Sequence, residues 1–135
     1  MIVADTSGLL ALLDEGEPRH EDVRRAAEAD RGPMVTIDLV LAELAFLLQR
    51  RLGAAAERDF LDQLLAGSLL REPVTGTDLR RAREILETYP DQGFGLTDAT
   101  VMAVAERLDV AVLTLDRRHF GVFRDASGRE LPLLP

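Results

Sequence analysis

The sequence contains no cysteine and no lysine, and all 16 of its basic residues are arginine. Without cysteine it has no disulfide framework, thiolate zinc site, iron–sulfur cluster or cysteine nucleophile. Without lysine it has no Schiff-base chemistry, no P-loop lysine and no counterpart of the lysine found in phosphoacceptor receiver domains. These absences exclude several large classes of enzyme and signalling protein.

Long hydrophobic runs are also missing. The longest nearly apolar stretch, Leu39 to Leu48, is interrupted by Glu43 and falls well short of the ~20 residues that span a bilayer. The first ten residues, MIVADTSGLL, have no basic segment and carry an acid at position 5, unlike a secretory signal. We therefore expect a cytoplasmic protein that does not enter a membrane.

The chain carries less positive than negative charge, since 24 acidic residues and 16 arginines give a net charge of −8. Non-specific affinity for nucleic acid comes mainly from basic residues that neutralise phosphates. Charge alone therefore does not make this chain a nucleic-acid-binding protein. A phosphate-containing substrate would need a metal ion as intermediary.

The chain has 135 residues, of which 47% are hydrophobic and 30% charged, as expected of one globular domain, 1–135. Short β-branched or apolar runs alternate with amphipathic segments, which indicates βαβ units and an α/β fold with a mostly parallel central sheet flanked by helices. Strands are expected near residues 2–4, 34–36, 68–73, 110–115 and 131–134. Helices are expected near residues 7–13, 17–30 (opened by Pro18), 38–51 (ended near Gly53), 54–65, 78–88 and 97–108.

Two acidic residues directly follow predicted strands: Asp5 comes after IVA, and Asp116 comes after VAVLTL. Ligand sites of open parallel sheets lie beyond the carboxyl ends of the strands, so both side chains are expected at one crevice. Each also has a purely structural interpretation, since Asp5 is a good helix N-cap and Asp116 is a good first residue of a turn.

A third acid, Glu43, lies in the apolar segment LVLAELAFLL. Its helical neighbours at three and four residues are all apolar: Leu39, Val40, Phe46 and Leu47. A carboxylate buried among them must be paired with arginine, protonated or bound to a cation, because an unpaired buried charge costs several kcal/mol. The alternatives are a salt bridge at the helix edge and a glutamate that reaches solvent.

The fourth acid, Asp98, lies in GLTDAT at the expected first turn of a helix that Thr97 caps. The helix dipole favours negative charge there, which explains an aspartate without any functional role. The following segment, ATVMAVAERL, is apolar enough to carry this first turn toward the interior. A structural and a functional role remain equally open.

Four carboxylates from distant segments repel one another unless a cation joins them, and hard cations such as Mg²⁺ or Mn²⁺ prefer oxygen ligands. Magnesium commonly binds substrate phosphates, so the group indicates a site for phosphoryl transfer or phosphodiester hydrolysis in which the metal lowers the pKa of an attacking water. The hydroxyls of Thr6, Ser7 and Thr114 stand beside the acids and could hold one of them or a water in place. Helix capping and strand propensity explain these three residues equally well.

At this point the sequence resembles a known family. Four motifs, MIVADTSGLLALL, the acid in TIDLVLAEL, GLTDA and TLDRRHF, are together similar to the PIN-domain ribonucleases and most closely to the VapC-type toxins of bacterial toxin–antitoxin pairs. The resemblance runs from Met1 to about Phe123. Each motif alone is weak, but the four in this order are specific.

The resemblance implies a PIN-like domain with a central parallel sheet of about five strands. It implies that Asp5, Glu43, Asp98 and Asp116 form the catalytic, metal-binding quartet, supported by Thr6 or Ser7 and by Thr114. It further implies Mg²⁺-dependent hydrolysis of single-stranded or looped RNA, with Mn²⁺ as a possible substitute, homodimers, and inhibition by a small antitoxin protein.

Several other residues carry weaker signals. Asp91 occupies a position where many such toxins have an acid, but a loop turn explains it better. Arg117 and Arg118 follow Asp116 and could meet RNA phosphates or lie in a solvated turn. The two histidines, His20 and His119, stand in polar segments that we expect to be exposed and non-catalytic. The single tyrosine and five phenylalanines are too scattered to form a base-stacking platform by themselves.

Other function classes remain beside the nuclease toxin. A receiver domain also gathers acids at strand ends but needs a lysine. A haloacid-dehalogenase-like phosphatase needs a second acid where this chain has Ser7. No feature of the sequence argues against a housekeeping RNA-processing nuclease of the same fold, or against a non-catalytic protein-binding module.

Overall fold

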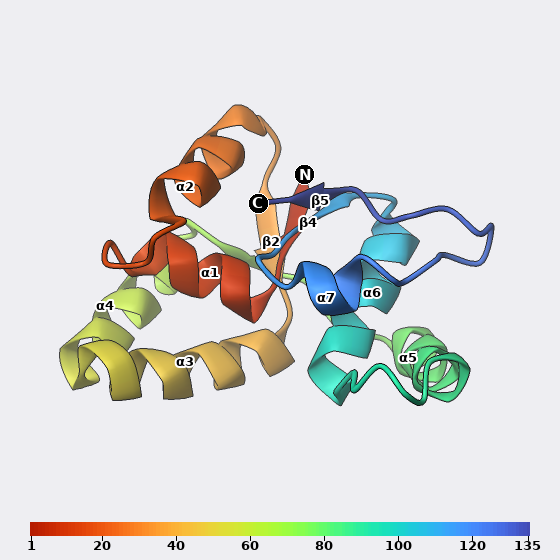
Figure 1. The fold of residues 1–135 in the computed structure, drawn as a ribbon. Helices are drawn as coiled ribbons and strands as arrows, with labels where there is room; N and C mark the ends of the chain where they lie inside the picture. The colour runs from red at the N-terminus through yellow and green to blue at the C-terminus, as the bar shows by residue number, and fades with distance from the viewer.

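The computed structural model describes residues 1–135 as an α/β fold around one five-stranded sheet (Figure 1). All strand pairs within the sheet are parallel, and the strand order is β3-β2-β1-β4-β5. The strands are β1 (Ile2–Ala4), β2 (Met34–Thr36), β3 (Leu70–Arg71), β4 (Ala111–Leu113) and β5 (Leu133–Leu134). Each lies within a segment expected to be a strand, so the predicted α/β class is confirmed.

The central strand β1 is buried along its whole length and pairs with β2 on one side and β4 on the other. A strand covered on both faces has no exposed face to fill with polar residues, which is why β1 and β4 read as continuous apolar runs. Their carboxyl ends lie side by side, because Ala4 pairs with Leu113. The residues that follow these two strands therefore leave the sheet at the same edge.

Seven helices surround the sheet. Figure 1 shows α1 to α4 on one side of the sheet and α5 and α6 on the other. Their bounds are α1 (Thr6–Leu13), α2 (His20–Ala29), α3 (Asp38–Leu52), α4 (Ala54–Leu65), α5 (Gly76–Thr88), α6 (Leu96–Leu108) and α7 (Arg117–Phe120). None of these helices combines the length and apolar character needed to cross a bilayer.

The start of α2 differs from the prediction. The helix begins at His20, and Pro18 lies in the preceding turn rather than in the first helical turn. In this turn the amide of Glu17 donates to the carbonyl of Asp14, and the His20 ring nitrogen Nδ1 lies 2.8 Å from the Ala11 carbonyl oxygen. His20 is therefore half-buried and tied to α1, and the expectation that it is exposed is wrong.

Helix α5 is attached to α6 by a charged clamp. Asp78 caps the start of α5 together with Thr75 and binds Arg107, near the end of α6, through Nε at 2.8 Å and Nη2 at 3.1 Å. Arg107 also pairs with Glu72 at 2.9 Å. Because α6 carries Asp98 near its other end, this clamp fixes the helix that delivers one of the candidate site residues.

Candidate metal centre

Asp5 lies at the carboxyl end of β1, is only 4% exposed and caps helix α1. Its Oδ2 atom accepts three hydrogen bonds, from the Ser7 amide (3.3 Å), the Ser7 hydroxyl (2.8 Å) and the Thr114 hydroxyl (3.0 Å). All three donors reach the same oxygen, so Oδ1 is left without a protein partner. The capping role expected of Asp5 therefore uses one carboxylate oxygen and leaves the other for a ligand.

Ser7 and Thr114 also tie the segment after β4 to the start of α1. The Ser7 Oγ atom accepts from the Leu115 amide at 2.9 Å, and the Thr114 Oγ1 atom accepts from the Asp116 amide at 3.0 Å. Gly8 permits this close approach, because a Cβ atom there would overlap the Leu113 carbonyl group. The two hydroxyls thus join the loop that carries Asp5 to the loop that carries Asp116.

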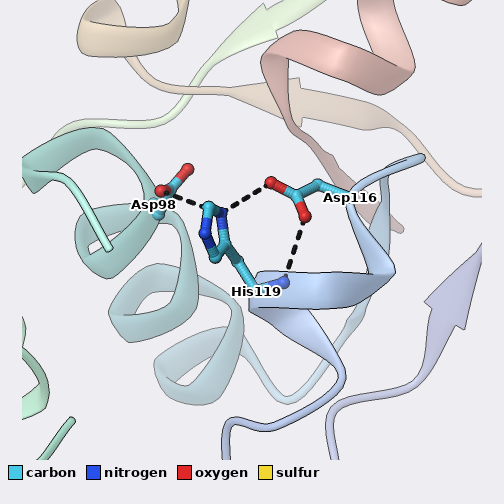
Figure 2. Close-up of side chains that lie close together, drawn as sticks. All are labelled: Asp98, Asp116 and His119. Carbon is cyan, nitrogen blue, oxygen red and sulfur yellow. Dashed lines mark hydrogen bonds and ion pairs between the residues drawn. The ribbon is translucent and has the colours of Figure 1, made fainter. Parts of the chain in front are cut away.

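Asp98, near the start of α6, meets Asp116 and His119, which lie at the start of α7 and within it (Figure 2). Asp116 caps α7 by accepting from the His119 amide at 3.0 Å, and its Oδ2 atom lies 2.8 Å from His119 Nδ1. The same Nδ1 lies 3.7 Å from Asp98 Oδ2. One ligand atom from each of the three residues lies within 4.8 Å of the other two, a spacing that a single metal ion could span.

Asp98 stands in the first turn of α6, where its Oδ2 accepts from the Gly95 amide at 3.2 Å. Gly95 is the N-cap, so the prediction that Thr97 caps this helix is wrong. A glycine N-cap has no side chain to accept a hydrogen bond, and the aspartate three residues later instead reaches back to the cap amide. Asp98 therefore has both the structural role and the position expected of a site residue.

Glu43 is exposed rather than buried, which corrects the expectation drawn from its apolar neighbours. Helix α3 buries only Val40, Leu44 and Leu48, a line spaced by four residues, while Phe46 stays exposed. The apolar stripe of α3 is thus wider than the part of the helix that packs against the core. Glu43 nevertheless lies close enough to Asp5 and Asp98 for their negative charges to raise the pKa of its carboxyl group.

The acids influence one another's ionisation. Partial burial of the carboxyl group, followed by repulsion from Asp5 and Asp98, raises the pKa of Glu43. Burial, together with repulsion from Asp5 and Asp116, raises the pKa of Asp98, although the Gly95 amide and His119 oppose the rise. Both carboxyl groups therefore gain from any positive charge placed between them.

The donor set fits a hard divalent cation. Carboxylate and hydroxyl oxygens are the ligands that Mg²⁺ and Mn²⁺ prefer. The Thr6 hydroxyl faces Glu43, yet its Oγ1 atom is buried and completes no hydrogen bond of ordinary geometry. Buried hydroxyls are nearly always satisfied by protein or water, so this oxygen is available to a water or cation that the acids attract.

We predict that Asp98→Asn raises the melting temperature at pH 7 in EDTA, or at least does not lower it. The asparagine oxygen still accepts from Gly95, while the repulsion with Asp5 and Asp116 disappears. Since the folded-state pKa of Asp98 is raised, its destabilising effect is full at neutral pH and declines as pH falls toward its ordinary range near 4. The wild-type and variant melting temperatures should therefore approach each other in acid.

Metal ions provide the second half of this test. Mg²⁺ at about ten times its dissociation constant should stabilise the wild type by roughly 1.4 kcal/mol and leave Asp98→Asn nearly unmoved. Thermal melts of both proteins in EDTA and in Mg²⁺ measure this difference. A clearly destabilised variant, with neither protein responding to Mg²⁺, would leave Asp98 as a helix-capping residue only.

His119 is the site residue that sequence reasoning missed. It was expected in an exposed segment, but it is half-buried, packs edge-on against Phe94 with ring centroids 5.6 Å apart, and contacts two of the four acids. The sequence contains one indication of this role, because a histidine three residues after Asp116 lies on the same face if the segment is helical. The sequence predicts no helix at Arg117–Phe120, so the spacing alone does not identify His119 as a site residue.

The remaining candidates lie outside the acid cluster. Asp91 is an exposed residue of the turn that precedes α6. Arg117 and Arg118 are exposed on α7, next to the site but in a helix rather than the expected turn. Tyr89, Phe94 and Phe123 pack against one another in the interior beneath His119 and do not form an exposed aromatic surface.

Comparisons with known proteins agree with this fold. The family model described as "PIN domain" matches residues 2–126. The chain is 33% identical to Ribonuclease VapC26 of Mycobacterium tuberculosis over 135 residues, which cover 99% of this chain and 100% of the relative.

Two solved structures share the fold. VapC20 of Mycobacterium tuberculosis, a toxin that cleaves the sarcin–ricin loop, superposes with a TM-score of 0.77 at 28% identity over 86% of this chain and 90% of VapC20. A toxin–antitoxin complex from Klebsiella pneumoniae contains a chain with a TM-score of 0.69 at 16% identity, covering 91% of this chain and 92% of that one. At 16% identity the second likeness concerns the fold alone.

Proposed function

The chain belongs to the PIN domain family and is a VapC-type ribonuclease, and from this premise we propose that it hydrolyses RNA phosphodiester bonds at a divalent-metal site formed by Asp5, Glu43, Asp98 and Asp116. Proteins of this type are the toxins of toxin–antitoxin systems. The likeness to VapC26 and VapC20, one called a ribonuclease and the other an RNA-cleaving toxin, supports this assignment.

The observation that carries the metal site is the mutual repulsion of the acids. Glu43 comes from α3, Asp98 from α6 and Asp5 from the end of β1, yet the pKa of each of the first two is raised, first by burial and then by the charges of other acids in the set. Segments far apart in sequence have thus delivered like charges to one place. Repulsion between these carboxylates destabilises the folded protein unless a positive charge offsets it. The arrangement therefore supports a cation bound among them.

The protein residues have distinct tasks in this proposal. Ser7 and Thr114 hold Asp5 by Oδ2, which leaves Oδ1 free for a ligand, and the Gly95 amide holds Asp98. His119 holds Asp116 at the start of α7. These contacts fix the acids before substrate arrives, which reduces the reorganisation needed during the reaction.

Mg²⁺ fits these ligands best, and Mn²⁺ is the natural substitute. When bound, such an ion supplies positive charge for the scissile phosphate and lowers the pKa of the attacking water. The acids position the cation and do not attack the phosphorus themselves. Because the whole chain carries a net charge of −8, RNA phosphates would otherwise be repelled from this site.

The test is a cleavage assay with the purified protein and cellular RNA. Cleavage should be absent in EDTA and return when Mg²⁺ or Mn²⁺ is added in excess. A protein that never cleaves RNA under either condition would be a non-catalytic member of the family. Cleavage that is unaffected by EDTA would refute the metal site.

We extend the proposal to partners. A small antitoxin protein would inhibit the nuclease by covering the acid cluster, and the active form would be a homodimer. The VapC character of the relatives supports the antitoxin. Free expression without toxicity, and no binding by the product of a neighbouring gene, would instead favour a housekeeping RNA-processing enzyme.

A further inference from the structure

One aromatic side chain of this protein is left in solvent. Phe46 on α3 is 56% exposed. Tyr89 is half-buried, and the other four phenylalanines are buried: Phe60, Phe94, Phe120 and Phe123. The other aromatic rings bury most of their surface, so Phe46 is the one ring whose face is open to a ligand.

The position of Phe46 connects it to the acid cluster. It lies three residues after Glu43 and four residues before Arg50 on α3, so all three side chains share one helix face. The Arg50 guanidinium carbon lies 5.4 Å from the centre of the Phe46 ring. From Glu43 toward the C-terminal end of α3, this face therefore presents a site acid, a flat apolar ring and a cation.

We propose that Phe46 and Arg50 form a subsite for the RNA substrate, in which the ring stacks on one base beside the scissile phosphate and the guanidinium meets a neighbouring phosphate. The inference rests on the proposed ribonuclease function. Proteins bind unpaired RNA bases by stacking them on aromatic rings and arginine planes. Stacking tolerates any base, so this subsite would anchor the strand without selecting a sequence.

Electrostatics make such an anchor necessary. A chain with a net charge of −8 and an acidic site gains little from general attraction to phosphate. Stacking does not depend on charge and supplies affinity where the acids repel. A protein interface centred on Phe46 is a poorer fit, because two of the neighbours of the ring on this face, Glu43 and Arg50, are charged, whereas the centre of a protein interface is depleted in charge.

The first experiment measures binding without cleavage. The probe is a fluorescein-labelled, 12-nucleotide single-stranded RNA of mixed sequence, followed by anisotropy in EDTA. Phe46→Leu should weaken binding about tenfold, while Phe46→Tyr should retain it, because only the tyrosine keeps a stacking ring. Leu79→Ala, which trims a 46% exposed apolar side chain on α5, is the matched control and should bind normally.

Arg50 is tested through the salt dependence of the same binding. Arg50→Gln removes one phosphate contact, so the slope of log K against log salt concentration should fall in magnitude by about 0.7. An arginine that only packs on Phe46 would leave this slope unchanged. That outcome would overturn its role at phosphate.

A spectroscopic test uses the absence of tryptophan from the chain. Phe46→Trp places a unique indole at the subsite, and its emission should be quenched saturably by RNA with the midpoint found by anisotropy. Binding that is normal in Phe46→Leu, or an indole that does not respond to bound RNA, would overturn the proposal. A change of molecular mass in Phe46→Leu would instead assign Phe46 to an interface with a second copy, and would also overturn it.

Failure of the subsite and failure of the ribonuclease function can be told apart. If wild-type protein cleaves RNA in Mg²⁺ and Phe46→Leu shows the same KM, only the subsite is wrong. If the subsite is right, Phe46→Leu raises KM about tenfold and keeps kcat. Wild-type protein that does not cleave RNA in Mg²⁺ would refute the proposed function itself.

Discussion

Replacing Asp5 with asparagine is expected to lower the rate of RNA cleavage by about a thousandfold, the upper range for losing one group that stabilises charge in a transition state. The substitution keeps the size of the side chain, and the asparagine oxygen can still accept from Ser7 and Thr114. Its amide nitrogen then takes the place of Oδ1, so a neutral donor faces the cation. The protein should therefore remain folded and lose its activity.

The measurement is single-turnover cleavage in Mg²⁺, with circular dichroism melts of the same samples. Asp62→Asn, an exposed aspartate on α4 away from the cluster, is the control and should cleave at the wild-type rate. Asp5→Asn activity within tenfold of wild type would show that Asp5 only caps α1.

The opposite behaviour is expected of Asp78→Ala, which should destabilise the fold by about 3 kcal/mol and leave cleavage by the folded protein unchanged. The Asp78 side chain is 2% exposed, and its removal leaves Arg107, which is 33% exposed, with Glu72 as its one remaining acidic partner and a long hydrogen bond to the Pro73 carbonyl. The substitution also removes half of the capping box of α5, because the Asp78 carboxylate accepts from the Thr75 amide, whereas Thr75 remains the N-cap. In a chain of this length the melting temperature should fall by roughly 10 °C.

The sign of the pH dependence adds to this prediction. Burial alone would raise the pKa of Asp78, but hydrogen bonds from Arg107 and Thr75 outweigh it and the pKa is lowered. The stabilisation is therefore present at neutral pH and lost as pH falls below the ordinary range near 4. Glu84→Ala, which breaks an exposed pair with Arg81, should change stability by less than 1 kcal/mol. A shift of less than 2 °C in Asp78→Ala would contradict the clamp.

Much of the fold could be predicted because the sheet is parallel and buried. Strands β1 and β4 are covered on both faces, so each appears in the sequence as an uninterrupted apolar run. Helix α4 was expected at the bounds it has, and α3 within one residue, because Gly53 separates two amphipathic segments. Helix α7 was missed because four residues are too short to show helical periodicity.

The candidate site was less completely predictable. Asp5 and Asp116 could be expected together, because the ends of neighbouring parallel strands meet at one edge of the sheet. The exposure of Glu43 could not, since an apolar stripe does not reveal how much of it the sheet covers. The role of His119 could not be predicted either, because its contact with Asp98 joins two helices whose relative placement is set by tertiary packing.

Anomalous diffraction from a crystal of the protein soaked in Mn²⁺ tests the central claim most directly. The result we predict is an anomalous peak within coordination distance of Asp5 Oδ1 and of carboxylate oxygens of Asp98 and Asp116, with Glu43 reaching it directly or through a water. The same soak of Asp5→Asn crystals should give a weak peak or none. A wild-type crystal with no peak at the cluster, or with manganese bound only elsewhere, would contradict the assignment of these four acids as the metal site.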